Sequence, residues 1–308
     1  MSMAGTKLPV AFIPVKGGLG NQMFIYAFGQ YLKENKIEPK FVWHEYIFNS
    51  HHHGVESLNI FDITISKFHR VQIACFIAAN SILPKSLKTV LGKIFERTYS
   101  LFFKRYYQTS PYSFDDVVSG IEGNNVYMDG FWQNYKYLLP IKDKILKLFS
   151  FRLPENFSDN QFLKKIINTN SVSIHIRRND YLNPTFQHFN VIKSIDYYLR
   201  SMDFVKSKCE NPEFFIFTDD MQWAKKNFKG ANYNFVEGNV GKLSYLDLYL
   251  ISKCKHNIIA NSTFSWWGGW LNNNPSKMVI APNIWTKTVK SSHFCPPEWI
   301  FLEVNGLD

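Results

Sequence analysis

The 308-residue chain contains few cysteines, and their spacing excludes several classes of protein. The four cysteines, Cys75, Cys209, Cys254 and Cys295, are far apart and form no CxxC pair. A small fold held together by disulfides, or a cysteine-based zinc site, needs closely spaced pairs. With 45% hydrophobic and 17% aromatic residues, the sequence instead predicts a globular protein of a reducing compartment, stabilised by its core.

Long hydrophobic runs are also missing. The longest, residues 71–83, is about 13 residues and includes three polar side chains, whereas a helix that spans a membrane needs about 20 apolar residues. Residues 11–15 form a short apolar run without the flanking charges and small residues of a signal peptide. We therefore expect a soluble, cytoplasmic protein.

Arginine is scarce as well. Only seven of the 35 basic residues are arginine, and two of these, Arg177 and Arg178, are adjacent. They follow residues 171–175, an alternating segment typical of a short buried strand. Ligands of open α/β sheets bind at the carboxyl ends of strands, and a guanidinium group can grip a phosphate with two hydrogen bonds. The pair fits either an anion site or a salt bridge to Asp180 that closes a turn.

The net charge of +10 is concentrated in residues 84–106, which hold six basic residues against one acid. Residues 87–103 predict a helix that combines lysines with aromatic side chains. Two interpretations stay open: a helix that lies on an anionic membrane surface, and an ordinary amphipathic helix with a solvated lysine face. A nucleic-acid-binding protein would expose its aromatic residues along a basic face, whereas here they have core spacing, so we expect no nucleic-acid partner.

The N-terminal half begins with a predicted strand at residues 9–15, a glycine-rich turn, GGLGNQM, and a helix. The turn is not a dinucleotide-binding fingerprint, because Met23 stands where the third glycine of GxGxxG would be. Its glycines permit close backbone approach, and the N-terminus of a helix favours anions or hydroxyl groups. The candidate ligand-binding residues at this turn are Gly18, Gly20 and Asn21.

The second half alternates strands and helices, which predicts a parallel, doubly wound sheet. The predicted strands are 171–175, 213–218, 233–237, 257–260 and 277–281, and the helices are 195–208, 221–228, 244–253 and 262–271. Ser262 and Thr263 are suitable caps for the last helix, whose N-terminus can bind a phosphate. We expect a linker at 150–159, an N-terminal domain at 1–155 and a C-terminal domain at 156–308.

Three separated segments resemble the bacterial α-1,2-fucosyltransferases: GGLGNQMFIYAFG (17–29), HIRRNDY (175–181) and NSTFSWWGGWLN (261–272), with FTDD (217–220) before the last. The resemblance weakens between about residues 45 and 125, where we expect acceptor choice to be encoded. It implies an α/β fold of two facing Rossmann-like domains, the GT-B type. It also implies inverting transfer of L-fucose from GDP-β-L-fucose to the 2-OH of a terminal galactose in a surface-glycan repeat unit, without a metal or other cofactor.

The same resemblance implies roles for individual residues. Arg177 is expected to hold the β-phosphate of GDP, Asp247 to meet the guanine, and the start of the 262–271 helix to surround the phosphates. The implied catalytic residues are Arg177 and Asp180. The implied donor-binding residues are His175, Arg177, Arg178, Asp247, Ser262, Thr263, Phe264, Ser265, Gly18, Gly20 and Asn21.

The remaining alternatives concern the metal, the base and the acceptor. Asp219 and Asp220 are the one pair of acids after a strand that suggests a metal, but arginine and a helix N-terminus can supply the charge instead. The amide of Asn21 cannot accept a proton, so either Asp129 or Asp180 is the base, or no strong base is needed. The expected acceptor is lipid-linked, at the inner face of the membrane. Another GDP-sugar transferase on the same fold is the alternative function.

Overall fold

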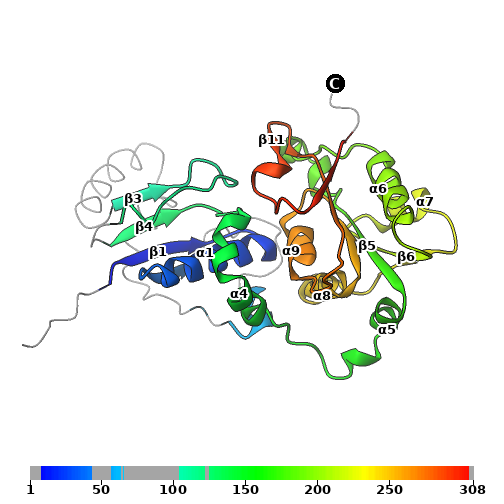
Figure 1. The fold of residues 1–308 in the computed structure, drawn as a ribbon, viewed down its shortest axis with the longest axis horizontal. Coiled ribbons are helices and arrows are strands. Elements are labelled where there is room, and N and C mark those ends of the chain that lie inside the picture. The colour runs from blue at the N-terminus through cyan, green and yellow to red at the C-terminus, as the bar shows by residue number, and fades with distance from the viewer. Residues whose placement is uncertain (1–7, 44–56, 64, 66–103, 122–124, 305–308) are drawn as a thin grey trace, which may run out of the picture. The chain divides into compact units, whose positions relative to one another are not determined.

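The computed structural model describes residues 8–43, 57–63, 65, 104–121 and 125–304. The chain forms two compact units, Met1–Phe149 and Ser150–Asp308 (Figure 1). The division therefore falls at the start of the predicted linker, six residues before the predicted domain boundary. The helix predicted at residues 87–103 lies outside the described residues. Among the residues described, no helix is both long and apolar enough to cross a bilayer.

Unit 1 contains a four-stranded sheet of order β2-β1-β4-β3, in which every pair of neighbours is parallel. Its elements are β1 (Val10–Val15), α1 (Leu19–Glu34), β2 (Glu38–Trp43), β3 (Lys104–Tyr107), β4 (Val126–Asp129) and α4 (Lys142–Leu148). The chain adds β2 on one side of β1 and β4 on the other, so the strand order reverses between β1 and β4. Strand β3 includes residues 104–106, the end of the predicted basic segment.

The turn between β1 and α1 depends on a glycine. Gly17 has φ of +78°, and a Cβ atom there would lie 2.5 Å from Asn21 Nδ2. Only glycine adopts this conformation without strain, so the chain can turn sharply from the strand into the helix. The buried side chains of this strand-turn-helix are Ala11, Ile13 and Val15 of β1 and Met23, Phe24, Phe28 and Leu32 of α1.

Unit 2 contains a six-stranded parallel sheet of order β12-β9-β8-β5-β6-β7. Numbered along this unit and read from β7, the order is 3-2-1-4-5-6, which is the Rossmann order. The strands are β5 (Asn170–Ile176), β6 (Pro212–Thr218), β7 (Tyr233–Phe235), β8 (His256–Ile258), β9 (Val279–Pro282) and β12 (Ile300–Leu302). The predicted α/β class with parallel sheets is therefore confirmed.

The helices of unit 2 agree with the predicted alternation. They are α5 (Gln161–Asn168), α6 (Asp196–Lys206), α7 (Met221–Asn227), α8 (Tyr245–Lys253) and α9 (Thr263–Leu271). Helix α5, strand β12 and the hairpin of β10 (Ile284–Thr286) and β11 (Val289–Lys290) were not predicted. The strands among them are two or three residues long, too short for alternation to show in the sequence.

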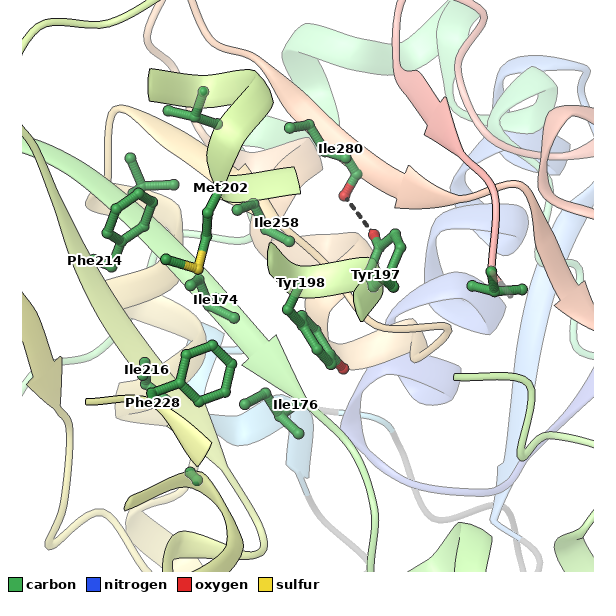
Figure 2. Packing of buried hydrophobic residues seen from close by; sticks show 14 of the residues in the cluster. Ile174, Ile176, Tyr197, Tyr198, Met202, Phe214, Ile216, Phe228, Ile258 and Ile280 are labelled. Carbon is green, nitrogen blue, oxygen red and sulfur yellow. Dashed lines mark hydrogen bonds between the residues drawn. The ribbon is translucent and has the colours of Figure 1, made fainter. Parts of the chain in front are cut away.

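Both faces of this sheet are covered. Along β6, Phe214 and Ile216 join a core with α6 and α7, whereas Phe215 and Phe217 join a second core with α5 and α8. Figure 1 shows α6 and α7 on one side of β5 and β6. In the first core the hydroxyl proton of Tyr197 is shared between the carbonyls of Ile259 at 2.8 Å and Ile280 at 3.2 Å. Figure 2 shows the hydrogen bond to Ile280. Burial on both faces explains why these strands are so apolar.

Candidate active site

The strand order reverses between β5 and β8, and ligands of open parallel sheets bind outside the carboxyl ends at such a point. The loop after β5 and the loop after β8 leave the sheet at this point, and hydrogen bonds of the buried residue Asn261 connect them. Asn261 Nδ2 donates to the carbonyls of Phe189 at 2.7 Å and Trp285 at 2.8 Å, and its own carbonyl accepts from the Tyr181 hydroxyl at 2.8 Å. The backbone around the site is therefore fixed by hydrogen bonds before any ligand binds.

Arg177 follows β5 and contacts two carboxylates. Its Nη2 pairs with Asp180, and its Nη1 lies 3.2 Å from Asp219 Oδ2 without the alignment of a hydrogen bond. Its side chain is 30% exposed, and that of Asp180 is 41% exposed. The salt bridge that the sequence allows is thus present, and the guanidinium group is still reachable from solvent.

Arg178 is held in a different way. Its Nε lies 3.1 Å from Asp220 Oδ2, its guanidinium group covers the Trp223 ring at 4.4 Å, and its backbone N–H donates to Asp219 Oδ1 at 2.9 Å. The charge and the planar face of this side chain are both used within the protein. Arg178 is therefore an anchor of the loop after β5, whereas Arg177 is the arginine available to a ligand.

Asp219 and Asp220, the two acids after β6, form the ion pairs with Arg177 and Arg178. Burial raises the pKa of Asp219, and the charge of Arg177 opposes that rise. Asp220 Oδ1 accepts from the Trp223 N–H at 3.0 Å and so caps α7. Within the described part of the chain, no three histidine, cysteine or acidic side chains are grouped as metal ligands. Asp219 and Asp220 are therefore the ion-pair partners that position the two arginines.

His175 is buried one residue before the end of β5, with 7% of its surface exposed. Its ring packs 5.6 Å from that of Phe264, and its Nδ1 has no hydrogen-bond partner among the described residues. Burial, aided by the charge of Arg177, lowers its pKa to about 3, so the imidazole is neutral at neutral pH. A buried polar atom left unpaired costs about 1–3 kcal/mol.

The N-terminus of α9 lies beside this histidine. The prediction that Ser262 caps the helix is wrong: it occupies the N-cap position, but its side chain makes no capping hydrogen bond. Ser265 is fully buried, and its hydroxyl lies 3.2 Å from the carbonyls of Ala260 and Ser262. Thr263 and Phe264 are partly exposed. The first turn of α9 therefore borders the site without a side-chain cap, a common setting for an anion.

Asp247 stands in the first turn of α8. Its Oδ1 accepts from Asn239 Nδ2 at 2.7 Å, and burial raises its pKa to about 7 although this hydrogen bond opposes the rise. Such a carboxylate can accept further hydrogen bonds from a ligand in its ionised form. The sequence did not point to Asn239, since it lies in a loop after a short strand.

The predicted donor-binding residues fall in both units. Most of them belong to unit 2, whereas three belong to unit 1: Gly18, Gly20 and Asn21. Gly18 occupies the N-cap position of α1, and Asn21 Oδ1 accepts from Gln133 Nε2 at 2.8 Å. Asn21 is thereby connected to the loop after β4, the neighbour of β1. Gln133 was not predicted, because its link to Asn21 spans 112 residues of sequence.

Comparison with known proteins adds the family. The model of the family described as "Glycosyl transferase family 11" matches residues 10–303. The chain belongs to glycosyltransferase family 11. An α-1,2-colitosyltransferase of Escherichia coli is 33% identical over 93% of this chain and 97% of the relative. The O-antigen biosynthesis glycosyltransferase WbnK of Escherichia coli is 31% identical over 94% of this chain and 99% of the relative.

More distant matches include a galactoside 2-α-L-fucosyltransferase, SEC1, of Bos taurus, 21% identical over 73% of this chain and 66% of the relative. Among solved structures, POFUT1 in complex with GDP-fucose matches with a TM-score of 0.42 at 11% identity, over 88% of this chain and 96% of that chain. Membership of family 11 confirms the predicted resemblance and the predicted enzyme class, a glycosyltransferase.

Proposed function

We propose that the protein transfers L-fucose from GDP-β-L-fucose to the 2-OH of a terminal galactose, with inversion at the fucose anomeric carbon. The observation that carries this proposal is Arg177, a partly exposed arginine at the strand-order reversal, with the N-terminus of α9 beside its strand. Both groups favour an anion, and GDP is the leaving group of such a transfer. Family membership and the galactoside-directed relative support the same reaction.

In the proposed mechanism, the bond between fucose C1 and the β-phosphate oxygen breaks as the galactose oxygen attacks the opposite face of C1. Negative charge develops on the β-phosphate, and fixed donors aimed at it lower the barrier. Arg177 supplies the positive charge that stabilises this phosphate, and Asp219 is its ion-pair partner. Asp180, the more exposed carboxylate, is the one that the phosphate displaces.

His175 and Asp247 have supporting roles in the proposal. The neutral imidazole of His175 offers its unpaired Nδ1 to the donor, as a donor or acceptor according to its tautomer. Asp247, held through one oxygen by Asn239, accepts from the guanine edge. Arg177 and the α9 N-terminus supply the positive charge that a metal ion supplies elsewhere. We therefore propose metal independence, also because Asp219 and Asp220 already hold the arginines.

The proposed acceptor is a galactose-terminated oligosaccharide, lipid-linked at the inner face of the membrane. The relative named for O-antigen biosynthesis supports a surface-glycan acceptor. Contact of residues 84–106 with an anionic membrane stays a prediction, because residues 84–103 lie outside the described part of the chain. Residues 104–106 belong to β3, paired with β4, so this end of the segment is a strand.

The colitosyltransferase relative favours a second candidate donor, GDP-colitose. Colitose is L-fucose without its 3-hydroxyl group, so the two donors differ by one polar group. A site that hydrogen-bonds a hydroxyl rejects the analogue lacking it by about 10⁴–10⁵, whereas an apolar pocket rejects an added hydroxyl by only about 10². A fucose-specific enzyme should therefore be nearly inactive with GDP-colitose, while a colitose-specific enzyme should retain some activity with GDP-fucose.

The test measures kcat/KM in EDTA for GDP-fucose, GDP-colitose and GDP-mannose, with a soluble β-galactoside acceptor and linkage analysis of the product. We expect an α-1,2-linked fucoside and a marked preference for GDP-fucose. A preference for GDP-colitose would mean that GDP-colitose, and not GDP-fucose, is the donor. A preference for GDP-mannose would overturn the proposal. Loss of activity in EDTA with recovery on adding manganese would overturn metal independence.

A further inference from the structure

Unit 2 has a second polar pair where its strands end, separate from the two arginines. Asp247 stands in the first turn of α8, and Asn239 belongs to the loop between β7 and that helix. Asn239 Nδ2 donates to Asp247 Oδ1 at 2.7 Å, and both residues are partly exposed. Because both belong to unit 2, the pair is complete within one compact unit.

The loop that carries Asn239 has a defined backbone. At its start the N–H group of Val236 donates to the carbonyl of Ile216 in β6 at 3.0 Å, and at its end the chain enters α8. The glycines on either side of Asn239, Gly238 and Gly241, have φ of 97° and 59°. Glycine adopts these values without strain, so the loop can bring the Asn239 amide back to the start of the helix.

Helix α8 directs Asp247 toward the proposed phosphate site. Helices α8 and α9 pack side by side (Figure 1), and a Cβ atom on Gly268 of α9 would lie 2.2 Å from Ile251 Cγ2 of α8. Asp247 is one turn before Ile251, and Phe264 is one turn before Gly268, so both lie on the facing sides of the two helices, nearer their N-termini. A nucleotide with its phosphates at the start of α9 can therefore extend its base toward Asp247.

The pair leaves hydrogen-bonding groups open to such a base. An ionised carboxylate only accepts, so the Asn239 amide turns its NH₂ group toward Asp247. Among the described residues, no further group bonds either side chain, so one N–H of Asn239 and Oδ2 of Asp247 are unused. The available order is donor, acceptor, acceptor.

The pairing edge of guanine is the complement of this order. It presents O6 as an acceptor, followed by N1–H and the 2-amino group as donors. Neighbouring members of this edge, like the two oxygens of a carboxylate, are bonded to one planar carbon and lie about 2.3 Å apart. Adenine has a donor at position 6 and an acceptor at N1, so it reverses the first two members. Uracil lacks the second neighbouring donor.

We propose that Asn239 is a specificity-determining residue, which donates to O6 of guanine while Asp247 accepts from N1–H and the 2-amino group. The inference rests on the proposed function for the presence of a GDP-linked donor, and it deepens that function by adding a second residue to recognition of the base. The alternative role for Asn239 is to orient the Asp247 carboxylate without contacting the base. The two roles differ in which atom of the base the enzyme distinguishes.

The test measures Kd by calorimetry for GDP, for IDP, which lacks the 2-amino group, and for 6-thio-GDP, whose sulfur is a weak acceptor. The wild type should bind IDP about 10–100-fold and 6-thio-GDP about 3–10-fold more weakly than GDP, as expected for hydrogen bonds to a charged and to a neutral group. Asn239→Leu should lose the discrimination at position 6 and keep most of that at position 2. Asp247→Asn should lose most of the discrimination at position 2.

Each ratio compares two nucleotides in one protein, so changes in the stability or protonation of the free protein cancel. Asn168→Ala, which removes a 2.8 Å amide hydrogen bond to the Lys164 carbonyl in α5, is the matched control and should keep both ratios. If Asn239→Leu does not fold, Asn239→Ala takes its place.

Two outcomes would overturn the role of Asn239. One is a wild type that binds 6-thio-GDP as tightly as GDP. The other is an Asn239 variant that weakens both nucleotides equally and keeps the wild-type ratio, which would mean that Asn239 only orients the carboxylate. The proposed function fails in a different way: tighter binding of UDP or ADP than of GDP by the wild type would contradict the GDP-linked donor itself.

Discussion

The two sheet edges share a topology but differ in chemistry. In each unit the strand order reverses beside the first strand, β1 in unit 1 and β5 in unit 2, and polar residues follow the strands there. In unit 2 these residues are two arginines held by three acids, with a buried neutral histidine. In unit 1 they are one lysine–aspartate pair and two joined amides. The first edge thus carries a partly exposed guanidinium group, and the second carries a partly exposed lysine–aspartate pair.

Under the proposed function, this difference predicts that the two edges have different roles. Parallel sheets place strand ends together in both units, but side-chain chemistry decides what each edge binds. Variants at the edge of unit 2 should therefore affect the donor, whereas variants at the edge of unit 1 should affect the acceptor.

The largest effect is expected at Arg177. Arg177→Ala removes the group proposed to stabilise the departing phosphate, so turnover should fall by about 10²-fold or more, as for lost oxyanion donors. Arg177→Lys keeps the charge but loses the two-pronged geometry and should recover only part. Steady-state kcat with saturating donor is the measurement, with the exposed Arg152→Ala as the control. Near wild-type turnover in Arg177→Ala would contradict the proposed role of Arg177 in stabilising the departing phosphate.

Arg178 is adjacent to Arg177 in sequence, but its guanidinium group contacts Asp220 and Trp223. The two arginines should therefore respond differently to substitution. Arg178→Met should lower the melting temperature as well as the rate, since it leaves Asp220 without its ion-pair partner. A variant of unchanged stability with a rate loss as large as that of Arg177→Ala would show that both arginines act on the donor.

A smaller, pH-dependent effect is expected at Asp247. Its pKa is about 7 in the folded protein against 3.8 for an ordinary aspartate. The ionised form is the one that accepts from guanine, so GDP affinity should weaken below pH 7, approaching tenfold per pH unit. Asp247→Asn should abolish this slope. Calorimetric titration of GDP across this range checks it, and an unchanged slope in the variant would assign the dependence to another group.

The same group affects stability without ligand. Between pH 3.8 and about 7 the folded state binds more protons than the unfolded state at this site. Its contribution to stability is therefore greatest at low pH, falls as pH rises through this window and is constant above it. Asp247→Asn should remove this component from a denaturation series.

The sequence predicted most of the fold of unit 2, because its strands are buried on both faces and therefore read as apolar runs. It also placed Arg177 and the start of α9 after two strands of one sheet, and the structure has them after the neighbouring strands β5 and β8. The sequence allowed the pair of Arg177 with Asp180 but did not identify Asp220 and Trp223 as partners of Arg178, because those contacts depend on β6 lying beside β5. The Lys16–Asp129 pair joins residues 113 apart, and only the pairing of β1 with β4 brings them together. Periodicity along a chain contains no information about such neighbours.

The smallest effect is expected at His175. Because its Nδ1 has no described partner, His175→Leu removes an unpaired polar atom and should leave the melting temperature unchanged or raise it. If that nitrogen bonds the donor, GDP-fucose affinity should fall about 3–10-fold, the value of one hydrogen bond. Thermal melting with and without GDP-fucose measures both quantities. Lower stability with unchanged affinity would mean that the histidine serves the core alone.

The most direct test of these different roles measures GDP release with and without a β-galactoside in two variants, Arg177→Ala at the edge of unit 2 and Asp129→Asn at the edge of unit 1. We predict that Arg177→Ala loses both acceptor-dependent release and the slower release by hydrolysis. Asp129→Asn should lose only the acceptor-dependent part and keep hydrolysis near the wild-type rate. The same pattern of loss in both variants would contradict the assignment of the donor to unit 2 and the acceptor to unit 1.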